Sequence, residues 1–393
     1  MSSSYRIFYV RLLSGLIHQL MILFGVFQII KTQNSPLLAG LLGLFLFIPS
    51  LIVPLVAVQY FKRITAIGRA FVFTHLIYFV ALVLILGNPN DDLILWYTAV
   101  FIASVARAIR VPFHYAILKQ LPHPVGRLAI INNLSWQVPI VLAPLLLTGL
   151  NQLFGSISVK VCLLLLSTLV VSISLPLIKH TVKSPSLDRQ PFLSEMKNQL
   201  RGTRRIWVPA GADLLIMMMV HLPVLIGSLL LFEQLPEMYF GPLVSFPMLV
   251  TILSVVMLAP KMVHLPASLS LGVSFLGIGV GLSVLLFAKG IFGLALGLLV
   301  IGLFDGVSIV VRDKLLIRHT STANVGLIAS LNAIFLSGSD ELGQALTGLG
   351  LEFGGPTLNL SLAAGAAVAL SMASFSFYFK PAGPQQRPAM TNN

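Results

Sequence analysis

Asp305, Asp340 and Glu341 stand inside strongly apolar stretches of this 393-residue sequence, where ionisable side chains are costly and usually have a use. Burial disfavours the charged form of a carboxyl group, so carboxylates placed there can take up and release protons. Asp305 is expected in the inner third of its apolar run, whereas Asp340 and Glu341 are expected past the middle of theirs. Acids at different depths suit a proton relay. We therefore predict that all three belong to a substrate or proton pathway.

Structural roles for the same acids remain open. Asp305 and Arg312 are seven residues apart on one helix face and could form an ion pair at a gate. Asp340 and Glu341 are adjacent, so they cannot both face the same partner. The candidates for gate or ion-pair roles are Arg107, Arg110, Arg312 and Asp213. The first two of these could alternatively bind an anionic substrate.

A second group of polar residues lies in the first half of the chain. Asn133 and Gln137 are four residues apart and share a helix face, and Trp136 follows Asn133 by three. Together they could stack against and hydrogen-bond a planar substrate. The alternative is that the amide side chains bridge neighbouring membrane helices. His18 is a candidate for a proton relay, or else a hydrogen-bonded histidine of the core.

Motifs of soluble enzymes are missing from the sequence. It has no Gly-rich lysine loop for nucleotides, which argues against an ATP-driven pump. It has no Cys/His cluster at metal-ligand spacing, and a single cysteine excludes an internal disulfide. We therefore predict no metal, no cofactor and no enzymatic reaction.

The elements that must position these side chains are membrane helices. The chain is 57% hydrophobic and 9% charged, whereas a soluble domain carries about 25% charged residues. Helices are expected because unpaired backbone groups are costly in lipid. Twelve apolar runs of about 20 residues are predicted to span the membrane. They are 9–30, 37–60, 67–87, 93–115, 127–150, 157–178, 209–232, 240–260, 267–288, 290–311, 325–350 and 356–379.

The basic residues predict the orientation. With the N-terminus in the cytoplasm, 3 of the 25 Lys and Arg residues fall outside, which leaves 25 − 3 = 22 inside. Both termini are therefore predicted in the cytoplasm of a bacterium, with the chain in its inner membrane. The net charge of +13 then faces the anionic inner leaflet of the lipid bilayer, and no nucleic-acid partner is expected.

The predicted organisation has four segments. They are an N-terminal six-helix bundle (1–178), a basic cytoplasmic linker (179–207), a C-terminal six-helix bundle (208–379) and a disordered tail (380–393). An internal sequence repeat relates the two bundles. Gly126, Ala129 and Asn132 are spaced like Gly326, Ala329 and Asn332, and Arg110 precedes the first copy as Arg312 precedes the second. The tetrapeptide Leu-Thr-Gly-Leu occurs at 147–150 and again at 346–349. The fold is thus predicted to be all-α, with two pseudo-symmetric halves.

Two stretches carry a resemblance to a known family. Residues 304–308 (FDGVS), 311–312 (VR) and 339–343 (SDELG) resemble helices ten and eleven of the enterobactin-exporter-like branch of the major facilitator superfamily. Helices four and five of that branch are matched by Arg110, Pro112, Gly126, Ala129, Asn132, Asn133, Pro144 and Gly149. The loop between the second and third runs departs from the family pattern. It keeps the basic pair Lys62-Arg63 but has Ala57 and Phe61 in place of the usual Gly and Asp.

The resemblance implies a secondary transporter that works by alternating access as a monomer. The predicted function is proton-coupled efflux of an amphipathic or siderophore-like small molecule. One alternative is a proton-coupled importer of the same fold. Another, from a different class, is a membrane-embedded enzyme or assembly factor that acts on lipid-linked intermediates.

Overall fold

The computed structural model describes residues 3–61, 64–88, 92–118, 125–181, 221–262, 264–319 and 325–379. Within these ranges the chain is helical apart from short turns, and no strand occurs there. The main helices are α1 (Ser3–Gln33), α2 (Pro36–Phe61), α3 (Ile67–Leu86), α4 (Leu93–Leu118), α5 (Val125–Phe154), α6 (Ser156–Ser174), α9 (Leu222–Phe232), α10 (Phe240–Met257), α12 (Ala267–Phe287), α13 (Gly290–His319) and α14 (Val325–Phe379). Short turns of helix are η1 (Leu175–Lys179), η2 (Glu237–Tyr239) and α11 (Ala259–Met262).

The described helices match eleven of the twelve predicted spans and part of the remaining one. In the described ranges, ten helices are long and apolar enough to cross a membrane. α14 is two helices that meet at Gly355, which adds one span to that number. α9 has 11 residues and covers only part of the predicted run 209–232, whose remainder lies outside the described residues, so the twelfth span stays a prediction. The prediction of an all-α membrane protein is confirmed.

Helix boundaries follow the apolar runs closely, with clear extensions at the start of α1, which begins at Ser3, and at the end of α13. α13 continues to His319, although its apolar run was predicted to end at 311. The extra residues are rich in Arg, Lys and Leu, which favour helix, so the helix continues beyond the apolar run. The separation of spans nine and ten occurs at Gly290, which has a φ of 73°. Gly355 has a φ of 67°, and glycine adopts this left-handed conformation without the steric cost that a side chain would add.

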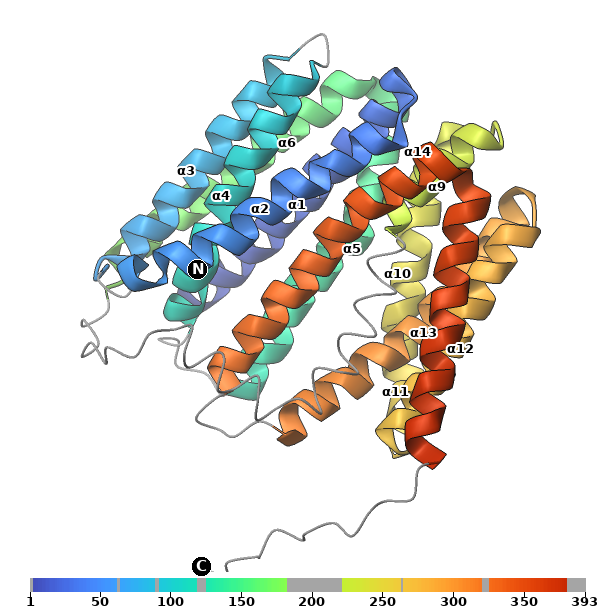
Figure 1. Ribbon diagram of the computed structural model, residues 1–393. Helices are drawn as coiled ribbons and strands as arrows, with labels where there is room; N and C mark the ends of the chain where they lie inside the picture. The colour runs from blue at the N-terminus through green and yellow to red at the C-terminus, as the bar shows by residue number, and fades with distance from the viewer. Residues whose placement is uncertain are drawn as a thin grey trace, which may run out of the picture.

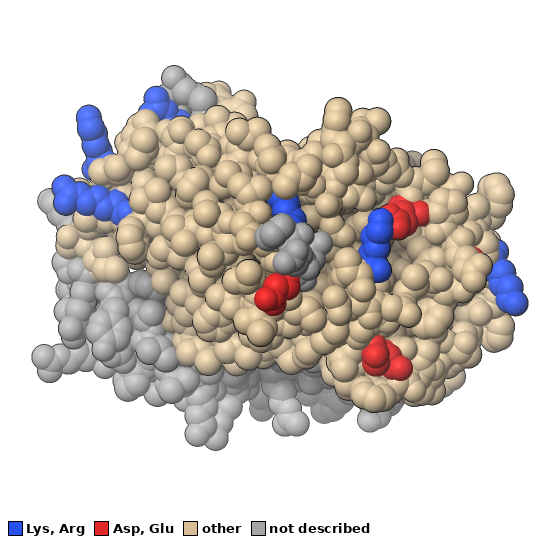
Figure 2. Space-filling model, turned by 90° about the horizontal axis from the view of Figure 1, so that it is seen from above, with Lys and Arg blue, Asp and Glu red and all other residues tan. Residues whose placement is uncertain are grey.

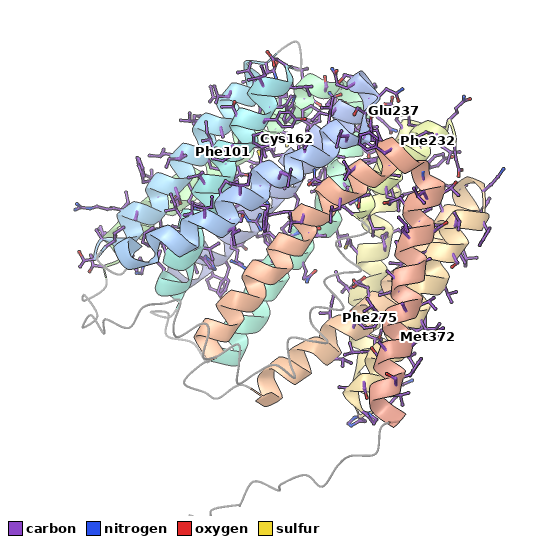
Figure 3. The ribbon with its side chains drawn as sticks, in the orientation of Figure 1. Phe101, Cys162, Phe232, Glu237, Phe275 and Met372 are labelled. Carbon is purple, nitrogen blue, oxygen red and sulfur yellow. The ribbon has the colours of Figure 1, made fainter. Side chains whose placement is uncertain are left out.

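The outer surface of the helices is apolar, as contact with lipid requires. Phe101, Phe232 and Met372 carry exposed side chains that point away from the helices, whereas Phe275 is fully buried (Figure 3). Cys162 lies half-buried on α6. The chain is therefore a multi-pass integral membrane protein.

Two bundles make up the molecule. Helices α1 to α6 group together, and α10, α12, α13 and the second part of α14 form the other group (Figure 1). The first part of α14 lies along α2, and α10 lies along α5, so these four helices join the bundles. The predicted linker lies almost entirely outside the described residues, as does the predicted tail.

The bundles meet closely at the end of the molecule where α1 gives way to α2. A Cβ atom added to Gly40 of α2 would lie 2.9 Å from the Cα atom of Gly348 in α14. In the same way, a Cβ atom on Gly241 of α10 would collide with Pro144 and Thr148 of α5. The Gly241 backbone N–H donates a hydrogen bond of 2.8 Å to Thr148 Oγ1. Glycine thus allows both helix pairs to pack backbone against backbone.

The repeated Leu-Thr-Gly-Leu tetrapeptide takes part in both of these contacts. Thr148 of the first copy meets Gly241 at the start of α10. Gly348 of the second copy meets Gly40 near the start of α2. Each copy therefore packs against the opposite bundle near the start of one of its helices. The face of this end is mostly uncharged, with Lys, Arg, Asp and Glu side chains scattered over it (Figure 2).

Candidate functional site

A cavity of about 380 Å³ lies between the two bundles. That volume falls within the range of about 300–1,000 Å³ for small-molecule sites. The N-terminal bundle contributes Val10, Arg11, Ser14, Gly15, His18, Gln19, Ile22, Leu23, Leu46, Phe71, Arg107, Arg110, Val111, His114, Trp136 and Ile140. The C-terminal bundle contributes His221, Pro223, Asp340, Glu341 and Gln344. Every arginine in this lining is on the first wall and both carboxylates are on the second.

An ion pair crosses the cavity from one bundle to the other. Arg107 Nη1 of α4 lies 2.8 Å from Glu341 Oε1 of α14, and the two side chains are 13% and 5% exposed. Ser50 of α2 donates a weaker hydrogen bond of 3.4 Å to the same oxygen. The second oxygen, Glu341 Oε2, is buried and accepts no hydrogen bond from the described residues. Such a pair attracts strongly only while both groups stay charged.

The same guanidinium group also binds His18. Arg107 Nη1 lies 2.7 Å from His18 Nε2, and since arginine can only donate, Nε2 must be the acceptor. The ring proton therefore sits on Nδ1, which donates to the Tyr78 hydroxyl at 3.3 Å. Tyr78 in turn donates to the sulfur of Met21 at 3.8 Å. His18 is thus a neutral, oriented imidazole that connects α3 to the ion pair.

Trp136 is an aromatic side chain of the wall that lies beside two arginines. The Cζ atoms of Arg107 and Arg11 lie 5.5 Å and 6.0 Å from the centre of its ring. Both distances suit cation–π attraction. The His18 ring lies 6.4 Å away and is tilted relative to the indole. Trp136 therefore holds two guanidinium groups near one another.

Arg110 differs from Arg107 in its partners. Its Cζ atom lies 5.8 Å from the centre of the Tyr78 ring. It forms no ion pair and no hydrogen bond within the described part of the chain. It is also close enough to Arg107 and Arg11 to be repelled by both positive charges.

Asp340 faces a different partner from its neighbour. Its Oδ1 atom lies 3.7 Å from His221 Nε2, and the aspartate side chain is 72% exposed. The backbone N–H of His221 donates to Thr347 Oγ1 at 2.8 Å, which fixes the start of α9 against α14. Adjacent residues on a helix point about 100° apart, so the two acids reach separate surfaces.

Asp305 does not join this cavity. It lies between α13 and α10, where Thr251 Oγ1 donates to its Oδ2 at 3.3 Å. Gln137 is described but does not line the cavity either. The side chains of Asn133 and Arg312, and the whole of Asp213, lie outside the described residues. The structure thus brings together His18, Trp136, Arg107, Arg110, Asp340 and Glu341 from the predicted set.

Other residues of the site were not singled out from the sequence. Arg11 is one of the basic residues counted on the cytoplasmic side, and its position inside the predicted run 9–30 is the signal that could have identified it. His221 falls inside the predicted run 209–232 and offered the same signal, whereas Tyr78 offered none. Gln344, one turn after Glu341, donates from Nε2 to the backbone oxygen of Ala39 at 2.9 Å.

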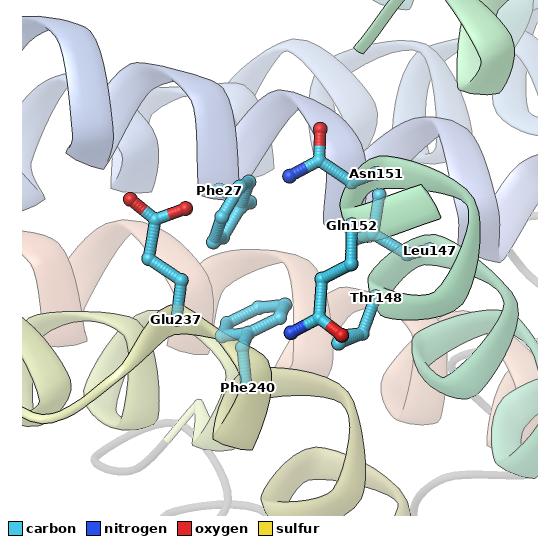
Figure 4. A pocket seen from close by; sticks show the side chains of 7 residues that line it. All are labelled: Phe27, Leu147, Thr148, Asn151, Gln152, Glu237 and Phe240. Carbon is cyan, nitrogen blue, oxygen red and sulfur yellow. The ribbon is translucent and has the colours of Figure 1, made fainter. Parts of the chain in front are cut away.

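A second, much smaller recess lies at the closely packed end. It is lined by Phe27, Leu147, Thr148, Asn151, Gln152, Glu237 and Phe240 (Figure 4). Its volume is about 10 Å³, room for roughly one water molecule. The rings of Phe27 and Phe240 are 5.3 Å apart and close it between α1 and α10. This recess is therefore part of the seal rather than a ligand site. Among the described residues, no group of three or more His, Cys, Asp or Glu side chains could hold a metal ion.

Comparisons with known proteins identify the fold. No family model matches the sequence, and no curated protein matches it. Among solved structures, a mutant of the nucleoside transporter NupG aligns with a TM-score of 0.75 and 14% identity, over 96% of this chain and 100% of that one. A peptide transporter POT mutant in complex with alafosfalin aligns with a TM-score of 0.74 and 13% identity, over 95% and 94%. A POT family transporter in complex with a thioalcohol conjugated peptide aligns with a TM-score of 0.73 and 12% identity, over 95% of this chain and 96% of that one. The chain therefore has the major facilitator type of membrane fold.

Proposed function

We propose that this protein is a secondary transporter that moves a small molecule by alternating access and couples the movement to protons. The observation that carries the proposal is the Arg107–Glu341 ion pair, which joins the two bundles within a cavity between them. The likeness to NupG and the POT proteins supports the transporter class, because NupG is a nucleoside transporter and POT is a peptide transporter.

The ion pair supplies a mechanism of coupling. While Glu341 is charged, its attraction to Arg107 holds the bundles together across the cavity. When Glu341 takes up a proton, most of that attraction is lost and the bundles can separate. Arg107 keeps His18 as a hydrogen-bond acceptor, so its guanidinium group does not become an unpartnered buried charge. The proton thus acts on the contact that must break during transport.

The closely packed end indicates which state the molecule occupies. Close contacts of α2 with α14 and of α5 with α10 seal one end, and the cavity lies on the other side of those contacts. If both termini lie in the cytoplasm, as the basic residues predict, this is a state that is closed toward the outside. The cavity would then exchange with the cytoplasm of a bacterial cell.

Export is proposed as the direction, on the resemblance of residues 304–312 and 339–343 to exporter helices. The experiment compares bacterial cells with and without the protein by untargeted mass spectrometry of small molecules. Export predicts compounds retained in cells that lack the protein. An importer of the same fold predicts those compounds in the medium instead.

Coupling is tested in inside-out vesicles that carry the protein and are supplied with a small-molecule extract of the same cells. We expect some compounds to accumulate with a proton gradient and none to accumulate after the gradient is collapsed. Chemical conversion of compounds by the purified protein without any gradient would favour the enzyme alternative. Accumulation that ignores the gradient would contradict proton coupling.

A further inference from the structure

We propose that Arg110 is the binding site for the negative group of the transported molecule, and that this molecule is a small organic anion with a flat apolar body. The inference rests on the proposed transport function, because it names the class of substrate. It assigns different tasks to two arginines one turn apart on α4. Arg107 joins the bundles, and Arg110 binds the ligand.

The first argument is the set of partners of Arg110. A guanidinium group has five N–H donors, and burying it without an acceptor is costly. Arg110 lines the cavity, yet within the described residues it forms no ion pair and no hydrogen bond. Its guanidinium group lies over the face of Tyr78, which offers no hydrogen-bond acceptor in the plane of the guanidinium group. Its donors are therefore available to a ligand in the cavity.

The second argument is the balance of charge. Three arginines and two carboxylates line the cavity, so with neutral histidines the net formal charge is 3 − 2 = +1. One of those carboxylates is already committed to Arg107. The other, Asp340, is on the opposite wall next to His221. Arg110 is repelled by the positive charges of Arg107 and Arg11, and an anion bound to Arg110 would offset that repulsion.

The third argument concerns the body of the ligand. The Trp136 ring lies between the two bundles beside Arg11 and Arg107, within 6.0 Å and 5.5 Å of their Cζ atoms. Ile140, Ile22 and Leu23 add apolar surface to the same lining. A flat apolar group can stack there while its negative group reaches the guanidinium group of Arg110.

The test uses three probes of the same shape and different charge: naphthoate, its neutral amide naphthamide, and the cation naphthylmethylamine. Binding is measured by isothermal titration calorimetry with the purified full-length protein in nanodiscs of neutral lipid. We expect naphthoate to bind about tenfold or more tightly than naphthamide, since a charge-assisted hydrogen bond replaces a neutral one. The cation is expected to bind most weakly.

Variants locate the site. Arg110→Gln should reduce the affinity for naphthoate to that for naphthamide, and Arg110→Lys should restore much of the difference. Arg69→Gln, which removes a guanidinium group from the exposed surface of α3, is the matched control and should bind like the wild type. Equal binding of naphthoate and naphthamide to the wild type, or full affinity for naphthoate in Arg110→Gln, would overturn the proposal. Unchanged affinity for naphthamide shows that the variants remain folded.

Two further outcomes distinguish this proposal from the binding of a lipid headgroup and from the proposed transport function. Phosphatidylglycerol added to the nanodiscs should leave naphthoate binding unchanged, whereas competition would identify the anion as a lipid headgroup and overturn the assignment. Arg110-dependent binding without any gradient-driven accumulation in vesicles would support the anion site and contradict the proposed transport. The failure of one proposal can thus be told from the failure of the other.

Discussion

The backbone oxygen of Glu341 lies directly against Gly43, so closely that a Cβ atom on Gly43 would collide with it. One residue of α14 therefore has its backbone fixed on α2 and its side chain paired with Arg107 of α4. This arrangement couples the position of the carboxylate to the packing of the helices. A change at Glu341 should therefore alter the packing of α2 against α14, and a change in that packing should move the Glu341 carboxylate.

Replacement of Gly43 by alanine tests this relationship. The added Cβ atom would meet Glu341 O and would lie 2.8 Å from Gln344 Cβ, so α2 and α14 would have to move apart. Overpacking of this kind typically costs about 1–3 kcal/mol. We expect Gly43→Ala to lower the unfolding temperature in detergent and to slow transport.

Gly149→Ala is the matched control, because nothing lies within 4 Å of a Cβ atom built there. It should leave both measurements unchanged. Wild-type stability and wild-type transport in Gly43→Ala would show that α2 and α14 do not pack this closely in the membrane.

Neutralising Glu341 should uncouple transport from protons. Glu341→Gln keeps the shape of the side chain but fixes it in the uncharged form, so the bundles are no longer held by Arg107. With a compound identified in the vesicle experiment, we expect exchange to continue while gradient-driven accumulation is lost. The wild-type exchange rate should rise as the pH on the cavity side falls, because protonation breaks the ion pair, and the variant should show no such dependence.

Two other acids serve as controls for that experiment. Asp305→Asn removes a carboxylate of the same bundle that does not line the cavity, and it should leave coupling intact. Asp340→Asn should weaken coupled transport less than Glu341→Gln, since Asp340 is 72% exposed and its partner is His221. Loss of coupling in Asp305→Asn with full coupling in Glu341→Gln would move the proton site to the other pair of helices.

Helix positions were largely predictable from the sequence, and the pairing of side chains was not. Lipid requires long apolar helices with internally satisfied backbones, so runs such as 67–87 give α3 almost to the residue. By contrast, Arg107 and Glu341 are separated by 234 residues. Their contact depends on the rotation and crossing of four helices, which hydropathy does not encode. For the same reason the sequence could not separate Glu341, in the cavity, from Asp305, outside it.

The internal Leu-Thr-Gly-Leu repeat marks positions where the two bundles are in contact. Its Leu-Thr-Gly-Leu copies both fall where the bundles touch, at Thr148 against Gly241 and at Gly348 against Gly40. Small residues recur there because close helix contact requires them. The repeated Arg110 and Arg312 cannot be compared in this way, since the Arg312 side chain lies outside the described residues.

Removal of the imidazole of His18 should slow transport without uncoupling it. His18→Leu takes away the acceptor that lies 2.7 Å from Arg107 Nη1 and the donor to Tyr78. An unsatisfied buried donor costs about 1–3 kcal/mol, which corresponds to roughly five- to 150-fold in rate if it is felt in the step that separates the bundles. His18→Gln retains an acceptor and should recover part of the rate. Loss of the proton dependence in both variants would instead place His18 on the proton pathway itself.

The Lys31–Glu237 ion pair should contribute little to holding the bundles together, although it joins them at the closely packed end. Its atoms are 2.9 Å apart, but the side chains are 49% and 51% exposed, so water and salt screen the attraction. Exposed pairs contribute up to about 1 kcal/mol, and we therefore expect Lys31→Met to change the exchange rate less than about fivefold. The measurement is exchange in proteoliposomes at low and high salt, where only the wild type should respond to salt through this pair. A loss of transport as large as that in Gly43→Ala would mean that the exposed pair, and not the glycine contacts, holds the end closed.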